Sequence, residues 1–131
     1  MALLHHIPVA SKSLRVLAML LSYPDAQLRA HLADMQAALQ QEGALSSARM
    51  AELAALIALL GHKPALEIEA DYVELFDRGR ATSLHLFEHV HGDSRDRGPA
   101  MIDLVKTYEQ AGLFLGEGEM PDFLPVVLEF A

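Results

Sequence analysis

The polar segment at residues 91–98, HGDSRDRG, holds the densest group of side chains that could do chemistry. It carries five charged or imidazole side chains and two glycines, and Leu-, Phe- and Val-rich stretches flank it on both sides. Opposite charges gathered between apolar helices can pair with one another as a structural latch, and they can equally form a docking site for a partner. Both interpretations of the segment stay open at the level of sequence.

Histidines beside this segment could ligate a metal ion. His85 and His89 are four residues apart and would share one face of a helix, and Asp93 follows closely. These three side chains could hold a divalent ion and support a metal-dependent hydrolase. The chain nevertheless has no HExxH motif and no cysteine. We therefore predict no bound metal and no cofactor, and the metal-dependent hydrolase is the alternative.

A strip of carboxylates, Glu67, Asp71 and Glu74, lies on one face of a predicted helix. Together with Glu69 and Asp77 these carboxylates could form an acid–base cluster. Acid–base catalysis needs carboxylates in contrasting environments, and this pattern is more typical of a solvated helix face or of an acidic rim around a basic peptide. The chain also lacks a Ser–His–Asp signature, a P-loop and a GxGxxG motif. We predict that the protein is not an enzyme.

The composition sets limits on the class of protein. The 131 residues suffice for one domain with a substantial core, and 52% hydrophobic with 21% charged residues is typical of a globular chain. A net charge of −8 argues against nucleic acid, whose phosphates would be repelled. No apolar run reaches the roughly 18 residues of a membrane span, and no signal peptide is evident. Together with the absence of cysteine, these features predict a cytoplasmic protein.

Apolar residues recur at helical spacing along the chain, and no useful length alternates with the period of two expected of a strand. Capping residues, glycines and prolines divide this pattern into helices at about residues 11–21, 25–42, 46–61, 64–76, 83–90, 99–111 and 123–131. We predict an all-α bundle of six or seven helices with the first helix at its centre. Asp122 is predicted to cap the last helix, and Phe76 to face the core beside Leu66 and Val73.

Four motifs give the chain a family resemblance. They are LSYPD (21–25), DYVELFD (71–77), HGDSRDRG (91–98) and PDFLPVVLEF (121–130). In this order they resemble the assembly chaperones of respiratory nitrate reductase, the NarJ type or delta subunit, within the wider family of redox-enzyme maturation chaperones. The resemblance covers most of the chain.

The resemblance implies an all-α cytoplasmic chaperone with no catalytic activity. Such a protein binds the N-terminal segment of the molybdenum-containing catalytic subunit and assists molybdenum cofactor insertion and enzyme assembly. Glu74, from the acidic strip, is a further candidate for partner binding. The family's signature positions fall here on Tyr72, Phe76, Asp77, His91, Gly92, Asp93, Arg95, Arg97, Gly98, Pro121, Asp122, Leu124, Pro125 and Leu128.

The chain departs from the family's pattern at two places. Members usually continue with further helices after the PVVLEF stretch, so residues 1–131 are predicted to be a single helical chaperone domain that lacks the C-terminal helices. Phe123 stands where a histidine is common. The missing cover over the last helix predicts a homodimer through Val126 and Phe130, since one apolar patch can cover its own copy. A generic helical oligomerisation module is the remaining alternative.

Overall fold

The computed structural model describes residues 11–92 and 94–131, and within these ranges the chain is helical. Its elements are α1 Ser11–Leu20, α2 Ala26–Ala30, α3 Leu32–Glu42, α4 Ser47–His62, α5 Ala65–Tyr72, the π-helix Val73–Asp77, α6 Leu86–Val90, α7 Arg97–Gln110 and α8 Leu124–Phe130. The β-type pairing in the described ranges is a single isolated bridge between His85 and Phe123. The predicted all-α class is confirmed. No helix in this part of the chain is long and apolar enough to cross a bilayer.

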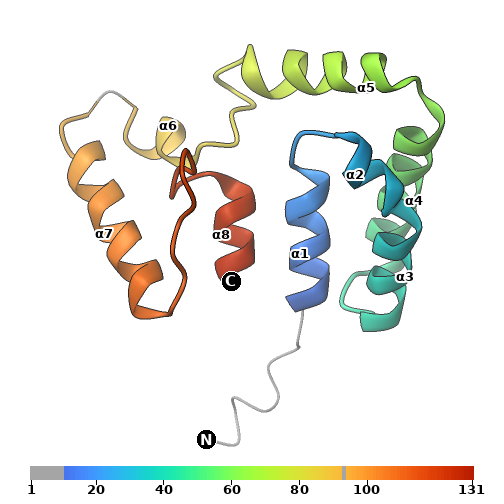
Figure 1. Ribbon diagram of the computed structural model, residues 1–131, viewed down its shortest axis with the longest axis horizontal. Helices are drawn as coiled ribbons and strands as arrows, with labels where there is room; N and C mark the ends of the chain where they lie inside the picture. The colour runs from blue at the N-terminus through green and yellow to red at the C-terminus, as the bar shows by residue number, and fades with distance from the viewer. Residues whose placement is uncertain (1–10, 93) are drawn as a thin grey trace, which may run out of the picture.

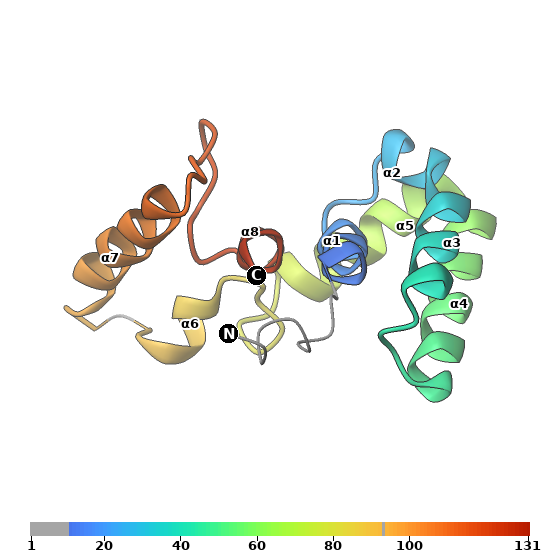
Figure 2. The ribbon, with the colours of Figure 1, turned by 90° about the horizontal axis from the view of Figure 1, so that it is seen from below.

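Helix α1 lies at the centre, as predicted. Figures 1 and 2 show α7, α8, α1 and the α3/α4 pair following one another across the molecule, while α5 runs across one end of α1. The most extensive helix contacts are those of α1 with α8 and with α3. Helix α1 therefore joins the N-terminal helices to the C-terminal part, and its first turn is held by Glu42, whose carboxylate accepts hydrogen bonds from the backbone N–H groups of Lys12 and Ser13.

The main core forms along a one-sided apolar stripe in the range 25–42, where the sequence predicted one helix. The stripe residues are all at most 8% exposed: Leu28, Leu32, Met35 and Leu39. They pack with Val16 of α1 and Ile57 of α4. Asp25 caps the first of these turns by accepting a hydrogen bond from the N–H of Leu28, at 2.8 Å.

The predicted second helix is divided in two at His31. The N–H of His31 bonds to the carbonyl of Leu28, only three residues back, which closes α2 before α3 begins. This division raises the number of α-helices in the described ranges to eight, against the six or seven predicted. The apolar stripe survives the break, since Leu28 and Leu32 are both buried in the same core cluster as Val16 of α1.

The predicted core face of the fourth helix is wrong, since none of Leu66, Val73 and Phe76 is buried. Leu66 is 82% exposed, and Ile68, 4% exposed, is the buried residue of α5. The helix continues past Tyr72 as a π-helix, a form that is rare and frequent at functional sites. As a result, Phe76 is half-buried in the wall of a groove rather than in the core.

The core assignment predicts a large difference between two leucines. We expect Leu39→Ala to lower the free energy of unfolding by about 2–5 kcal/mol, because it leaves a cavity among α1, α3 and α4. Leu66→Ala is the matched control and should stay within about 0.5 kcal/mol of wild type. Urea unfolding measures both. Equal losses at the two positions would contradict the packing described here.

Candidate functional site

An apolar groove of about 290 Å³ opens where the end of α1 meets α4 and α5. Its lining residues are Leu20, Leu21, Ser22, Pro24, Leu56, Leu59, Leu60, Lys63, Ile68, Asp71, Tyr72, Leu75 and Phe76. Leu56, Leu59 and Leu75 are between 38% and 51% exposed, so the groove presents large apolar side chains to solvent. Its volume lies at the lower limit of the roughly 300–1,000 Å³ of small-molecule pockets, which suits the anchor side chains of a peptide better than a whole cofactor.

Tyr72 and Phe76, two predicted site residues, form the aromatic wall of this groove. Their ring centroids are 4.8 Å apart, and Tyr23 meets Tyr72 edge-on at 5.6 Å. The hydroxyl of Tyr72 donates a 2.8 Å hydrogen bond to the carbonyl of Leu21, and burial raises the pKa of this hydroxyl. Tyr72 therefore ties the end of α1 to α5 and fixes the shape of the groove.

The charged edge of the groove is formed by Lys63 and Asp71. The ammonium of Lys63 lies 2.9 Å from Asp71 and 3.4 Å from Glu67, and its bond to Asp71 raises the pKa of Lys63. Glu74, the third member of the acidic strip, lies 3.4 Å from Arg78. The strip is thus exposed, as predicted, but each of its carboxylates has a cationic neighbour.

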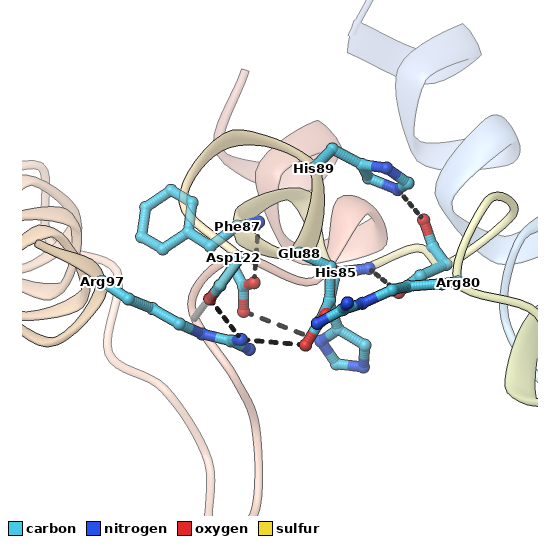
Figure 3. Close-up of polar contacts among 9 residues, drawn as sticks. Arg80, His85, Phe87, Glu88, His89, Arg97 and Asp122 are labelled. Carbon is cyan, nitrogen blue, oxygen red and sulfur yellow. Dashed lines mark hydrogen bonds and ion pairs between the residues drawn. The ribbon is translucent and has the colours of Figure 1, made fainter. Parts of the chain in front are cut away.

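Asp122 is completely buried and caps a helix other than the predicted one. Its Oδ2 accepts a hydrogen bond from the N–H of Phe87 (Figure 3). Its main-chain carbonyl accepts one from the N–H of Leu86, so Asp122 caps α6 and not α8. The N–H of Leu124 bonds in turn to the carbonyl of Leu84. The carbonyl of Leu84 and the N–H of Leu86 are therefore bonded to the segment before α8 and not within a helix. Accordingly, α6 begins at Leu86, three residues later than predicted.

Glu88 links two arginines in the same region. Arg97 donates to Oε1 of Glu88 at 2.9 Å and to the carbonyl of Gly92 at 3.1 Å, and Nε of Arg80 lies 3.3 Å from Oε2 (Figure 3). Arg97 therefore pairs as the interpretation of a structural latch expects, but its carboxylate belongs to α6 and not to the segment 91–98 itself. We call Asp122, Glu88, Arg97 and Arg80 the latch, since they hold α6 to α8, α7 and the loop after the π-helix.

The histidines that suggested a metal site have other partners. Nε2 of His89 lies 2.8 Å from the carbonyl of Ser83, and Nδ1 of His85 lies 3.6 Å from Oδ1 of Asp122 (Figure 3). Asp93, the third proposed ligand, lies outside the described residues. Within the described ranges no group of three or more His, Asp and Glu side chains is placed to hold a metal ion.

The remaining predicted residues fall into two groups. Around the latch, the ring of His91 stands edge-on to Phe87, Gly92 has a φ of +54°, and Arg95 and Gly98 are exposed beside the start of α7. Before and within α8, Pro121 is buried and its carbonyl accepts a 2.7 Å hydrogen bond from Tyr108, while Pro125 and Leu128 belong to the helix that packs on α1. Asp77 lies between the regions and lines a polar cavity with Glu88.

Sequence reasoning missed the part of the groove that α4 supplies. Leu56 and Leu59 line the groove, whereas Met50, Leu53 and Ile57 of the same helix pack in the core. The available signal was that α4 is apolar around more than one side, which a helix packed on only one face does not need.

A second apolar hollow borders α7 and is lined by Met101, Ile102, Val105, Lys106, Glu109, Met120 and Pro121.

The latch predicts how stability depends on pH. Arg97 and Arg80 lower the pKa of Glu88 below its ordinary value of 4.5, so the pair stabilises the fold above that pH and loses its effect as the pH falls through the lowered value. We expect Glu88→Gln to be less stable than wild type near neutral pH, with a difference that shrinks below about pH 4.5. Urea unfolding at a series of pH values measures this, with Glu109→Gln on α7 as control. A difference that does not change with pH would contradict the pairing.

Comparison with known proteins connects this geometry to a family. Residues 21–131 match the family model described as nitrate reductase delta subunit. The chain is 49% identical over 115 residues to the nitrate reductase molybdenum cofactor assembly chaperone NarJ of Escherichia coli K12, covering 88% of this chain and 49% of that protein. It is 43% identical over 117 residues to the probable chaperone NarW of the same organism, covering 89% and 48%. The chain therefore spans about half the length of these relatives.

A solved structure shares the fold. A candidate redox enzyme maturation protein from Archaeoglobus fulgidus superimposes with a TM-score of 0.63 at 21% identity, over 92% of this chain and 68% of that one. At this identity the similarity concerns the fold alone, and it agrees with the all-α architecture. Because the family model matches most of the chain, and because its four motifs occur in the matched range, this chain belongs to the nitrate reductase delta subunit family.

Proposed function

We propose that this chain is a nitrate reductase assembly chaperone that holds the N-terminal segment of the catalytic subunit in the groove between α1, α4 and α5. By holding that segment, it assists molybdenum cofactor insertion. The observation that carries the proposal is an apolar groove walled by the signature residues Tyr72 and Phe76, in a chain nearly half identical to NarJ. The E. coli relatives are named as assembly chaperones, and the proposed role is accordingly binding without catalysis.

The groove suits one face of an amphipathic helix. Its leucines offer apolar contacts, and Asp71 stands at its edge in a chain of net charge −8. Helix-in-groove binding takes most of its affinity from apolar anchors, while charges at the rim select and steer the peptide. A peptide with an apolar face and basic flanks is the ligand that these side chains fit. The cytoplasmic location stays a prediction from the sequence.

The latch has a different place in this proposal. Its side chains bond to one another and to backbone groups. The helices that the latch joins, α6, α7 and α8, contribute no residue to the lining of the groove. We assign to the latch the positioning of α8 against α1. Signature residues of the 91–98 and 121–130 stretches would then affect peptide binding only through the fold.

The homodimer through Val126 and Phe130 stays a prediction. The ring of Phe130 packs on Tyr108 with centroids 4.9 Å apart, and Val126 is half-buried. Phe130 is 39% exposed, so the apolar patch that remains for a second copy is smaller than the sequence indicated.

Peptide binding is tested most simply by calorimetry with a synthetic N-terminal peptide of the cognate catalytic subunit. We expect binding to the unmodified chain and a loss of at least about tenfold for Leu59→Asp, because a carboxylate in an apolar groove costs well over 1 kcal/mol when unpaired. Leu66→Asp is the matched control, since Leu66 is exposed on α5 and does not line the groove.

The two variants give distinct outcomes. Both should keep the wild-type circular dichroism spectrum, because both leucines are exposed to solvent. Equal affinity for Leu59→Asp and the unmodified chain would place the peptide elsewhere. Absence of binding to the unmodified chain at high micromolar peptide would contradict the proposal for these 131 residues.

A further inference from the structure

Two charged side chains belong to the lining of the groove as the structure describes it, Lys63 and Asp71. They lie on different walls, Lys63 directly after α4 and Asp71 near the end of α5. Their ion pair of 2.9 Å therefore spans the edge of an otherwise apolar groove. A peptide lying in the groove has to accommodate this pair.

Lys63 has a second carboxylate within reach. Glu67 lies one helical turn before Asp71 on α5, and its Oε1 is 3.4 Å from the ammonium of Lys63. Asp71 and Glu67 are both more than half exposed, and the lysine side chain is 34% exposed. Lys63 can thus move from Asp71 to Glu67 by a small rotation of a flexible side chain, without ever losing an anionic partner.

We propose that Lys63 is a specificity-determining residue of the groove. In the free protein Lys63 pairs with Asp71, and in the complex a cationic side chain of the bound peptide helix takes its place beside Asp71. The inference rests on the proposed peptide-binding function. It goes beyond that function by stating that the peptide side chain recognised beside Asp71 is positively charged. Lys63 then turns to Glu67. A peptide with a neutral residue beside Asp71 leaves the Lys63–Asp71 pair intact and gains no affinity from Asp71.

The charges around the groove favour a cation over an anion as the group that is recognised. Glu67, Asp71 and Glu74 all lie on the α5 side, and two of them meet Lys63, so the edge keeps a net negative charge after the pairing. An acidic side chain of the peptide would compete for one ammonium against two carboxylates that are already in contact. A cationic side chain of the peptide needs only to displace one exposed ion pair, whose stability is small.

The experiment scans the cations of the N-terminal peptide. Each Lys and Arg of the synthetic peptide is replaced in turn by Gln, and calorimetry measures the binding of every peptide to the unmodified chain and to three variants. One peptide position should lose affinity by about two- to fivefold on the unmodified chain, which is the size of an exposed ion pair. Asp71→Asn should abolish that dependence, and Lys63→Met should tighten the binding of the unmodified peptide while leaving the Gln peptide unchanged.

The third variant and two controls keep the result unambiguous. Glu67→Gln should weaken binding of the cationic peptide, because Lys63 then lacks its alternative partner. Lys106→Met and Asp103→Asn make the same changes of net charge on α7, away from the groove, and should have no such effect. All variants are first checked for an unchanged thermal unfolding temperature.

The outcomes separate this inference from the proposed function. Tighter binding by Lys63→Met that depends on one peptide cation would support it. Unchanged or weaker binding by Lys63→Met, or an equal loss for cationic and Gln peptides on Asp71→Asn, would overturn the role of Lys63 while leaving peptide binding in place. No binding of any peptide to the unmodified chain would overturn the proposed function, and this inference with it.

Discussion

The buried carboxylate of Asp122 is the interaction on which the C-terminal part of the molecule depends. A carboxylate that is 0% exposed has to be hydrogen-bonded, and here its Oδ2 accepts the N–H of Phe87 at the start of a helix formed 35 residues earlier in the chain. Its Oδ1 has no hydrogen-bond partner among the described residues, and Nδ1 of His85 lies 3.6 Å away. The positive end of α6 is a favourable place for this carboxylate. By bonding to Phe87, Asp122 brings Phe123 beside His85 and sets the direction in which the chain enters α8. Helix α8 then packs on α1, and α1 carries one wall of the groove.

This arrangement divides the signature residues of the family by physical role. Two of the charged ones, Arg97 and Asp122, bond to Glu88 and to backbone groups and hold helices together. The aromatic ones, Tyr72 and Phe76, line an open apolar groove. Charge density in the sequence therefore marked the latch, whereas the groove that we propose for the peptide is mostly apolar and lies elsewhere. Apolar surface left open to solvent is the more usual sign of a binding site.

Helical periodicity predicted much of the fold, but it predicted less of the candidate site. The stripe of α2 and α3 could be predicted because every fourth or third residue is apolar on one side only. The pairing of Arg97 could be predicted because a guanidinium between apolar helices needs a carboxylate. The partner of Asp122 could not, since an aspartate before an apolar helix is normally its local cap and nothing in the sequence points to a distant one. The groove was missed for a related reason: it is formed by the second faces of α4 and α5, and Leu66 and Ile68 are equally apolar residues of which only one is buried.

The division between groove and latch is the central claim, and an NMR titration tests it most directly. The chain is labelled with nitrogen-15, the unlabelled N-terminal peptide of the catalytic subunit is added, and the backbone amide shifts are followed residue by residue. The account predicts that the largest changes gather at groove residues, including Leu59, Tyr72 and Leu75, while amides of the latch such as Glu88 and Arg97 stay close to their free positions. Changes gathered at the latch, or on the α7 hollow around Ile102, with the groove unaffected, would contradict it.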